Sequence, residues 1–246
     1  MELSTLAFVL AVFVLAGFAK GIIGLGLPTI SMGLLALVLS PVEAAALLIL
    51  PSLVTNVWQM LDGPHLRSLL RRLWPLNLSV CVGTWAGAAF LSGVGGPYGA
   101  LALGFALMAY ALSGLAALKL AVPPVAERWA GPFAGAMTGA ITAATGVFVI
   151  PAVPYLQSIG LTKDELVQAL GLSFTISTLA LAVTLTGSAG RGLELAWPAV
   201  AGVVVALVGT RLGQAVRARL SPPTFRLWFF SGLLALGAYL AARGLV

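Results

Sequence analysis

One lysine stands alone in an apolar, glycine-rich stretch near the start of the chain. Lys20 is the only charged residue between positions 3 and 42, and Gly21, Gly24 and Gly26 follow it closely. An ammonium group inside a membrane costs about 2.5–3.5 kcal/mol on insertion scales, whereas glycines let the backbone come close to a ligand. This combination favours a binding site for an anion. The alternative is that Lys20 extends to the membrane surface.

The residues after these glycines predict the start of a helix. Pro28 suits the first turn of a helix, and the free N–H groups of a first turn form a site for anions. We expect these groups to point into the same space as Lys20, with the hydroxyl of Thr29 as a further donor to the substrate.

A polar stripe follows in the next apolar stretch. Ser52, Thr55, Asn56 and Gln59 are spaced i, i+3, i+4 and i+7, so they share one face of a helix. Such a stripe inside a membrane span either lines a cavity or bonds to a neighbouring helix. The sequence favours the cavity, in which Asn56 and Gln59 would hydrogen-bond the substrate.

A second break of glycine and proline lies in the other half of the chain. It offers the hydroxyls of Thr142 and Thr145 and the backbone near Gly146, and it carries no charge. If the two breaks face each other, one supplies charge and the other supplies neutral donors, and Ser177 completes the site. The alternative for the threonines is a hydrogen bond to the preceding turn of their own helix.

The elements that position these residues must lie in a membrane. The chain has 246 residues, of which 60% are hydrophobic and only 8% are charged, and its mean hydropathy is +1.08. A soluble domain carries about 25% charged residues and has too little interior to hide so much apolar surface. This excludes a soluble enzyme, a nucleic-acid-binding module and a disordered chain. The net charge of +6 comes from basic residues in short connections, which orient a membrane protein.

The chain offers a series of stretches of about 20 apolar residues, the length that a membrane-spanning helix needs. Two further regions, 3–39 and 129–160, are too long for one helix, short for two, and interrupted near the middle. We therefore predict an all-α, polytopic integral membrane protein with about 8–10 helical segments, in which the first segment of each half is broken or re-entrant. The uninterrupted spans are roughly 41–61, 73–92, 97–118, 164–187, 194–213 and 224–242.

The two broken regions are part of an internal repeat that divides the chain into halves, 1–121 and 122–246. If each broken region is a hairpin, the halves are inverted, nearly all basic loops share one side, and both termini lie outside the cytoplasm. If each is one bent span, the halves are parallel. Positive-inside bias favours the inverted arrangement. Shifts of 122 to 126 positions pair Gly17 with Gly139, Gly24 with Gly146, Glu43 with Glu165, Asn56 with Thr178, Gly83 with Gly209 and Gly87 with Gly213.

The sequence offers no candidate catalytic, metal or cofactor residues. All acidic residues sit at the ends of spans or in connections, and for the single cysteine, Cys81, we expect a buried structural role. An intramembrane enzyme needs a nucleophile with a base, or a metal cluster, so it is a poor alternative. Trp74-Pro75 and Trp197-Pro198 are expected to begin helices at the membrane surface.

These residues resemble the sulfite exporter TauE/SafE family of membrane transporters over essentially the whole chain. The resemblance rests on residues 17–29 (GFAKGIIGLGLPT), 51–59 (PSLVTNVWQ), 135–151 and 217–222 (RARLSP). It implies a transporter in the cytoplasmic (inner) membrane that moves sulfite, sulfonates or related organic anions. The second break has fewer glycines than many family members, which implies a more closed tip there.

The mechanism that this resemblance implies is alternating access, in which one half rocks against the other around a central anion site. An anion channel is the alternative, and the sequence does not separate a channel from a carrier. Besides the small anion and the lipid bilayer, a coupling proton, a coupling sodium ion and a homodimer are all compatible with the residues, whereas a nucleic-acid partner is not. The identity of the anion and the direction of transport stay open.

Overall fold

The computed structural model describes residues 2–90, 94, 98–116, 120–186, 192–217 and 222–245. Within these ranges the chain forms ten α-helices and no strand, which confirms the predicted all-α class and the number of helical segments. Three of the basic residues used to predict the topology, Lys119, Arg191 and Arg219, lie outside the described ranges.

The first half of the chain forms five of these helices. α1 (Leu3–Ile23) and α2 (Leu27–Leu35) are the two parts of the first broken region. Three longer helices follow, namely α3 (Pro41–Leu61), α4 (Leu66–Phe90) and α5 (Gly99–Ala116).

The second half shows the same order of one long, one short and three long helices. α6 (Pro124–Thr145) and α7 (Ala152–Ser158) are the two parts of the second broken region. α8 (Lys163–Leu185), α9 (Gly192–Arg217) and α10 (Pro222–Arg243) follow them. Both predicted breaks are therefore observed.

Each long helix ahead of a break ends at a glycine in the left-handed conformation. Gly24 closes α1 with a φ of 75°, and Gly146 closes α6 with a φ of 71°. The N–H of Gly24 donates to the carbonyl of Lys20, and the N–H of Gly146 donates to that of Thr142, as at a helix C-cap. Gly26, with a φ of 110°, lets α2 start directly afterwards, with a proline in its first turn as predicted.

Helices α1, α3, α5, α8, α9 and α10 each contain a stretch that is long and apolar enough to cross a membrane. A helix of 20 residues is about 30 Å long, which matches the hydrocarbon core of a bilayer. Large apolar side chains such as Phe105, Phe133 and Val204 face outward, while the polar side chains of Lys20 and Asn56 are buried. The protein is therefore an integral, multi-pass membrane protein.

Helix α4 begins earlier in the chain than the sequence predicted. It starts at Leu66, so Trp74 and Pro75 lie inside it rather than at its start, and Trp197 and Pro198 likewise lie inside α9. The prediction was wrong because a run of apolar residues marks only the part of a helix that lies in the membrane. Three arginines in the first two turns of α4 are good helix formers, and they extend the helix beyond its apolar run.

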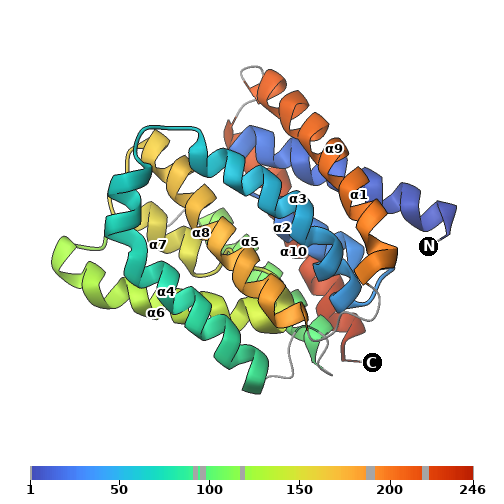
Figure 1. Cartoon of the computed structure of the whole chain (residues 1–246), viewed down its shortest axis with the longest axis horizontal. Helices are drawn as coiled ribbons and strands as arrows, with labels where there is room; N and C mark the ends of the chain where they lie inside the picture. Colours follow the sequence, from blue (N-terminus) through green and yellow to red (C-terminus); the bar gives the residue numbers. More distant parts are fainter. Residues whose placement is uncertain are drawn as a thin grey trace.

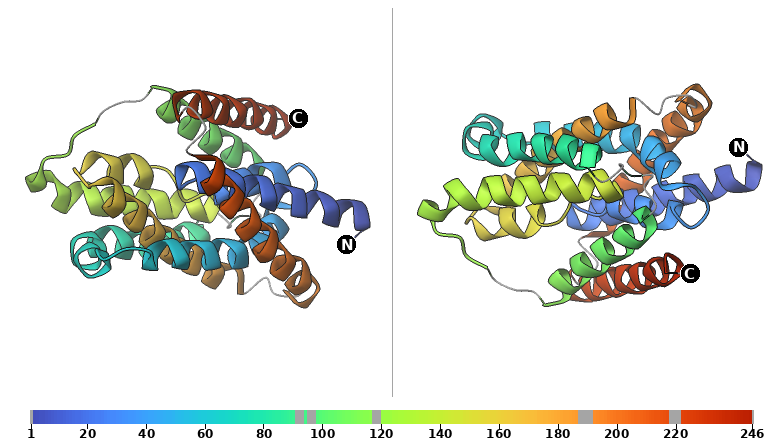
Figure 2. Two further views of the ribbon diagram at one scale, coloured as in Figure 1. Left: turned by 90° about the horizontal axis from the view of Figure 1, so that it is seen from above. Right: turned by 90° about the horizontal axis from the view of Figure 1, so that it is seen from below.

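The long helices pack in three layers (Figures 1 and 2). α1 and α6 lie in the middle, α5 and α10 form a pair on one side, and α3, α4, α8 and α9 lie on the other side. The most extensive contacts join helices from opposite halves of the chain: α1 packs against α9, α4 against α6, α3 against α8, and α5 against α10. The two halves are therefore interleaved rather than set side by side.

Glycines set the closest of these contacts. α1 and α9 run in the same direction, and a Cβ added to Gly17 would lie 2.2 Å from the carbonyl oxygen of Ala206. α6 and α4 meet in the same way, since a Cβ added to Gly139 would lie 2.3 Å from the carbonyl oxygen of Val80. Small residues let membrane helices come this close, so these glycines determine how the halves fit together.

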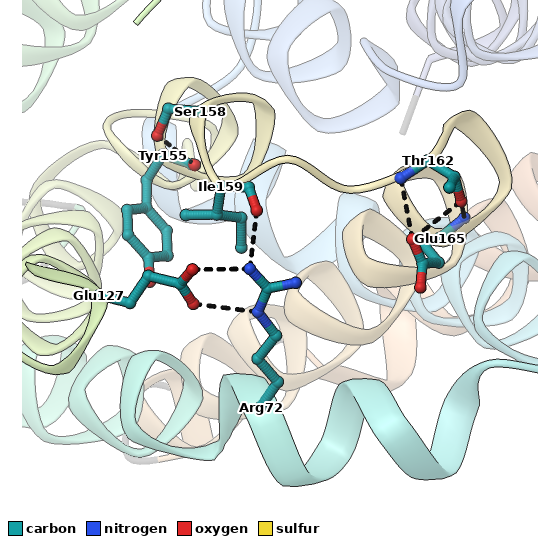
Figure 3. Close-up of polar contacts among 7 residues, drawn as sticks. All are labelled: Arg72, Glu127, Tyr155, Ser158, Ile159, Thr162 and Glu165. Carbon is teal, nitrogen blue, oxygen red and sulfur yellow. Dashed lines mark hydrogen bonds and ion pairs between the residues drawn. The ribbon is translucent and has the colours of Figure 1, made fainter. Parts of the chain in front are cut away.

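An ion pair joins α4 and α6 at one end of the bundle (Figure 3). Arg72 donates to the two carboxylate oxygens of Glu127 at 2.6 and 3.0 Å, and to the carbonyl of Ile159 at 2.7 Å. Close by, Glu165 caps the start of α8, where its carboxylate accepts from the N–H and the hydroxyl of Thr162. This is the capping box of an acidic residue near a helix start, and it confirms the predicted position of Glu165.

We call this end of the bundle the basic end, because the basic residues at helix ends gather there. The amide of Gln168 in α8 donates to the carbonyls of Met60 and Gly63, which places the C-terminus of α3 at the same end. At the opposite end, Arg243 donates to the carbonyl of Leu37. The basic residues of the basic end are Arg67, Arg71, Arg72, Arg128, Lys163 and Arg217.

Candidate functional site

A cavity of about 100 Å³ extends from the first break to the basic end. Its inner part is formed by Lys20, which is only 5% exposed, and by Thr55. Its outer part is formed by the exposed residues Asp62 and Arg217. The residues that line it are Lys20, Gly21, Ile23 and Gly24 of α1, Thr55, Trp58, Gln59 and Asp62 at the end of α3, Val167 of α8, and Leu207, Thr210, Gln214 and Arg217 of α9.

The ammonium group of Lys20 is the chemical centre of this cavity. It donates to the hydroxyl of Thr55 at 3.1 Å and to the side-chain oxygen of Asn56. A lysine has three donors, so one is left for a ligand. Among the described residues, no carboxylate oxygen lies within 4.0 Å of this nitrogen. A buried charge without a counter-ion is costly, and a bound anion would remove that cost.

The C-terminal ends of three helices meet around the cavity. The last turns of α1, α3 and α9 contribute Gly24, Gln59 and Arg217. The carbonyl groups at these ends carry partial negative charge. Lys20 in the last turn of α1 and Arg217 in the last turn of α9 offset that charge, so the site depends on its basic side chains to attract an anion.

The N-terminus of α2 lies apart from the cavity, although we expected from the sequence that its N–H groups would share the space with Lys20. None of residues 25–29 lines the cavity. Gly26 instead faces the ring of Phe229, and Thr29 is fully buried with a hydroxyl that has no hydrogen-bond partner among the described residues. The physical reason is packing, since α2 contacts α3 and α10, and the ring of Phe229 in α10 lies beside Gly26 at the start of α2.

The two predicted amide side chains hold the inner part of the site in place. The Nδ2 of Asn56 donates to the hydroxyl of Ser52 at 2.9 Å, while its Oδ1 accepts from Lys20. The Nε2 of Gln59 donates to the carbonyls of Gly24 at 3.3 Å and Val167 at 2.9 Å. Because both amides bond to other groups of the protein, they orient Lys20 and the end of α1.

The residues of the second break lie outside this cavity. The hydroxyls of Thr142 and Thr145 donate to carbonyls one turn earlier in α6, at 2.7 and 2.6 Å. This is the alternative arrangement, in which a threonine bonds to its own helix. A Cβ added to Gly146 would lie 2.8 Å from the methyl carbon of Met32. The second break is therefore packed against α2, and the first break lies beside a cavity.

Ser177 of α8 is buried and has no hydrogen bond to Lys20 or its partners among the described residues. Its hydroxyl donates to the carbonyl of Ser173 at 2.9 Å. The next residue, Thr178, reaches α3 instead, with its Oγ1 3.3 Å from Oγ of Ser52. This contact is the alternative for the polar stripe, in which one of its members bonds to a neighbouring helix.

The side of the cavity that α9 forms was not predicted from the sequence. Thr210, Gln214 and Arg217 line it, and they are spaced i, i+4 and i+7, which is the signal that could have identified them. At its edge the guanidinium of Arg211 lies 4.7 Å from the ring centre of Trp58. This cation–π contact links α9 to α3 beside the opening.

Cys81 does not have the buried position that the sequence predicted. It is half-buried in α4, where it lines an apolar groove of about 540 Å³ between α4 and α8. The tryptophans Trp74 and Trp85 line the same groove, and both are exposed. The prediction was wrong because this face of α4 points outward from the bundle, and an apolar stretch does not tell which of its faces does so.

Comparison with known proteins identifies the chain by its family. The family model described as "Sulfite exporter TauE/SafE" matches residues 9–240, which is nearly the whole chain. No curated protein and no solved structure gives a significant match.

Proposed function

The chain belongs to the sulfite exporter TauE/SafE family and is a membrane transporter, and from this premise we propose that it carries small anions across the cytoplasmic (inner) membrane. The substrates of this proposal are sulfite, sulfonates or related organic anions. The anion binds in the cavity beside the first break, where Lys20 supplies the charge that attracts it.

The observation that carries this proposal is the environment of Lys20. Its ammonium is buried at the inner end of a cavity, bonded to the neutral groups of Thr55 and Asn56, and has no carboxylate partner among the described residues. Arg217 at the outer end adds a second positive charge, which offsets the carboxylate of Asp62 at the same end. A single anion that fits about 100 Å³ can therefore be drawn inward and paired with Lys20.

The proposed mechanism requires two inverted repeats, and the helix contacts support them. Gly17 contacts Ala206, and Gly139 contacts Val80. In the sequence repeat, a shift of 122 positions pairs Gly17 with Gly139, and a shift of 126 pairs Val80 with Ala206. Equivalent residues of the two halves therefore make the same helix contact. α1 runs toward the basic end and α6 runs away from it, as inverted halves require.

The direction in which the cavity faces follows from the charges. Basic residues mark the cytoplasmic side of membrane proteins, so we assign the basic end to the cytoplasm. The cavity extends from Lys20 to Arg217 at that end, and the described state is then open to the cytoplasm. In the proposed cycle, rocking of one half against the other closes this path and opens one on the opposite side.

The proposal is tested by replacing the charge of Lys20. The variant Lys20→Met keeps an unbranched side chain of similar length but cannot donate to an anion. A hydrogen bond to a charged group contributes about 1.5–3 kcal/mol, so we expect the affinity for sulfite to fall by roughly tenfold to a hundredfold. Lys163→Met removes the same charge at the exposed start of α8 and serves as the matched control.

Uptake of sulfite into liposomes that contain the purified protein gives the readout, together with a thermal shift of the protein in detergent with and without sulfite. Unchanged saturable flux in Lys20→Met would show that this lysine does not bind the substrate. Counterflow against a sulfite gradient separates a carrier from the alternative of an anion channel, because a channel does not exchange an anion on one side for an anion on the other.

A further inference from the structure

A chain of buried hydrogen bonds connects Lys20 to the second half of the protein. Lys20 donates to Oδ1 of Asn56, and Nδ2 of Asn56 donates to Oγ of Ser52 at 2.9 Å. Oγ of Ser52 lies 3.3 Å from Oγ1 of Thr178, which in turn lies 2.7 Å from the carbonyl oxygen of Phe174. The side chains of Asn56, Ser52 and Thr178 are at most 1% exposed.

The number of protons on each group determines which group donates and which accepts in this series of hydrogen bonds. A hydroxyl has one proton, and the proton of Thr178 is donated to the carbonyl of Phe174, which can only accept. Thr178 must therefore accept from Ser52, so the proton of Ser52 points toward α8. Ser52 can then accept from the NH₂ group of Asn56, which leaves the amide oxygen of Asn56 to face the ammonium of Lys20.

An amide can rotate by half a turn and exchange its oxygen with its NH₂ group. In the rotated state the NH₂ group of Asn56 would face the ammonium of Lys20, so two donors would oppose each other. The bond from Asn56 to Ser52 prevents this rotation only while the proton of Ser52 points elsewhere. Thr178 is the group that receives this proton.

We propose that Thr178 is a positioning residue for the anion site: by accepting from Ser52 it fixes the amide of Asn56 and thereby the ammonium of Lys20. The inference rests on the proposed function, because Lys20 must bind the anion for its position to matter. Thr178 does not itself line the cavity. The proposal therefore adds a residue outside the cavity to the groups that control anion affinity. Fully satisfied buried networks of this kind are more rigid than their separate bonds suggest.

The test replaces Thr178 by valine, which has the same shape but cannot accept a hydrogen bond. Thr175→Val is the matched control, since Thr175 is also buried in α8 and its hydroxyl bonds only to the carbonyl of Gly171 in its own helix. Thr178→Ser restores the acceptor. Sulfite affinity and the maximal rate of flux are measured in liposomes for each variant, and the unfolding temperature is measured in detergent.

Loss of one neutral hydrogen bond changes an equilibrium by roughly twofold to tenfold, so we expect Thr178→Val to weaken sulfite affinity by that factor. Thr175→Val and Thr178→Ser should bind as the unchanged protein does, and the unfolding temperatures of the two valine variants should agree. Equal affinity in Thr178→Val and Thr175→Val would overturn the inference.

A parallel measurement on Lys20→Met separates the two ideas. If Lys20→Met loses sulfite binding while Thr178→Val keeps it, Lys20 binds the anion and the positioning role of Thr178 is wrong. If Lys20→Met itself binds sulfite normally, the proposed anion site is wrong and the role of Thr178 fails with it.

Discussion

Replacing Gly17 by alanine should force α1 and α9 apart. The added Cβ would lie 2.2 Å from the carbonyl oxygen of Ala206, and real Cβ atoms come no closer than 3.0 Å to such an atom, so the helices must separate by about 0.8 Å (3.0 − 2.2) at this point. The obstacle is backbone, which cannot rotate away as a flexible side chain could. Because the interior is closely packed, the contact has no empty space that could take up the added methyl group.

The size of the effect follows from this overlap. Adding a methyl group to a tightly packed contact costs typically about 1–3 kcal/mol. For a chain of this size, each kcal/mol corresponds to roughly 2–4 °C in unfolding temperature. We therefore expect Gly17→Ala to lower the unfolding temperature by roughly 2–12 °C. Gly139→Ala should behave alike, because its Cβ would lie 2.3 Å from the carbonyl oxygen of Val80.

The assay is thermal unfolding in detergent, followed by tryptophan fluorescence. Gly232→Ala is the control, since Gly232 lies in α10 with no atom within 4 Å of an added Cβ. Alanine favours a helix by about 1 kcal/mol over glycine, so this control should be neutral or stabilised. If Gly17→Ala unfolds at the same temperature as Gly232→Ala, the close packing of α1 on α9 is refuted.

Contacts at the basic end give three smaller predictions. A double-mutant cycle of Arg72→Gln and Glu127→Gln should give a coupling energy of about 0.2–1 kcal/mol that decreases with salt, because Arg72 is 39% exposed. A coupling energy of zero would mean that this ion pair does not stabilise the contact between α4 and α6. Thr162→Ala removes the cap of α8 and should cost about 1 kcal/mol in unfolding experiments, and an unchanged stability would contradict the capping role. With Cys81→Ala as background, Arg67→Cys should react with an impermeant thiol reagent from the cytoplasmic side alone; labelling from the opposite side would reverse the assigned orientation.

The sequence predicted those parts of the fold that depend on local patterns. Apolar runs located the spans, and the glycines near Gly24 and Gly146 located both breaks, because a left-handed residue at a helix end strongly favours glycine. It did not predict that α1 packs against α9 or α4 against α6. Such partners lie far apart in the chain, and no local pattern specifies them.

For the candidate site, too, the sequence predicted the features that depend on local patterns and not those that depend on contacts between distant helices. Lys20 could be singled out because a charge is rare in an apolar stretch, and the stripe of Thr55 and Asn56 could be recognised from its helical spacing. The spacing of Thr210 and Gln214 indicates that they share one face of α9. It does not indicate that this face turns toward the cavity, because that depends on the glycine contacts with α1. The second break carries the same threonine and glycine types, yet its neighbour Met32 fills the adjacent space.

The pairing of α1 with α9 also has a consequence for the order of synthesis. From the end of α1 to the end of α9 the ribosome must add a further 194 residues (217 − 23), which takes about 10–40 s at 5–20 residues per second. During that time the face of α1 that carries Gly17 must wait in the membrane without its partner. The face of α1 that carries Gly17 is thus covered only once α9 has been made, and a chain interrupted before α9 leaves that face open to other membrane proteins.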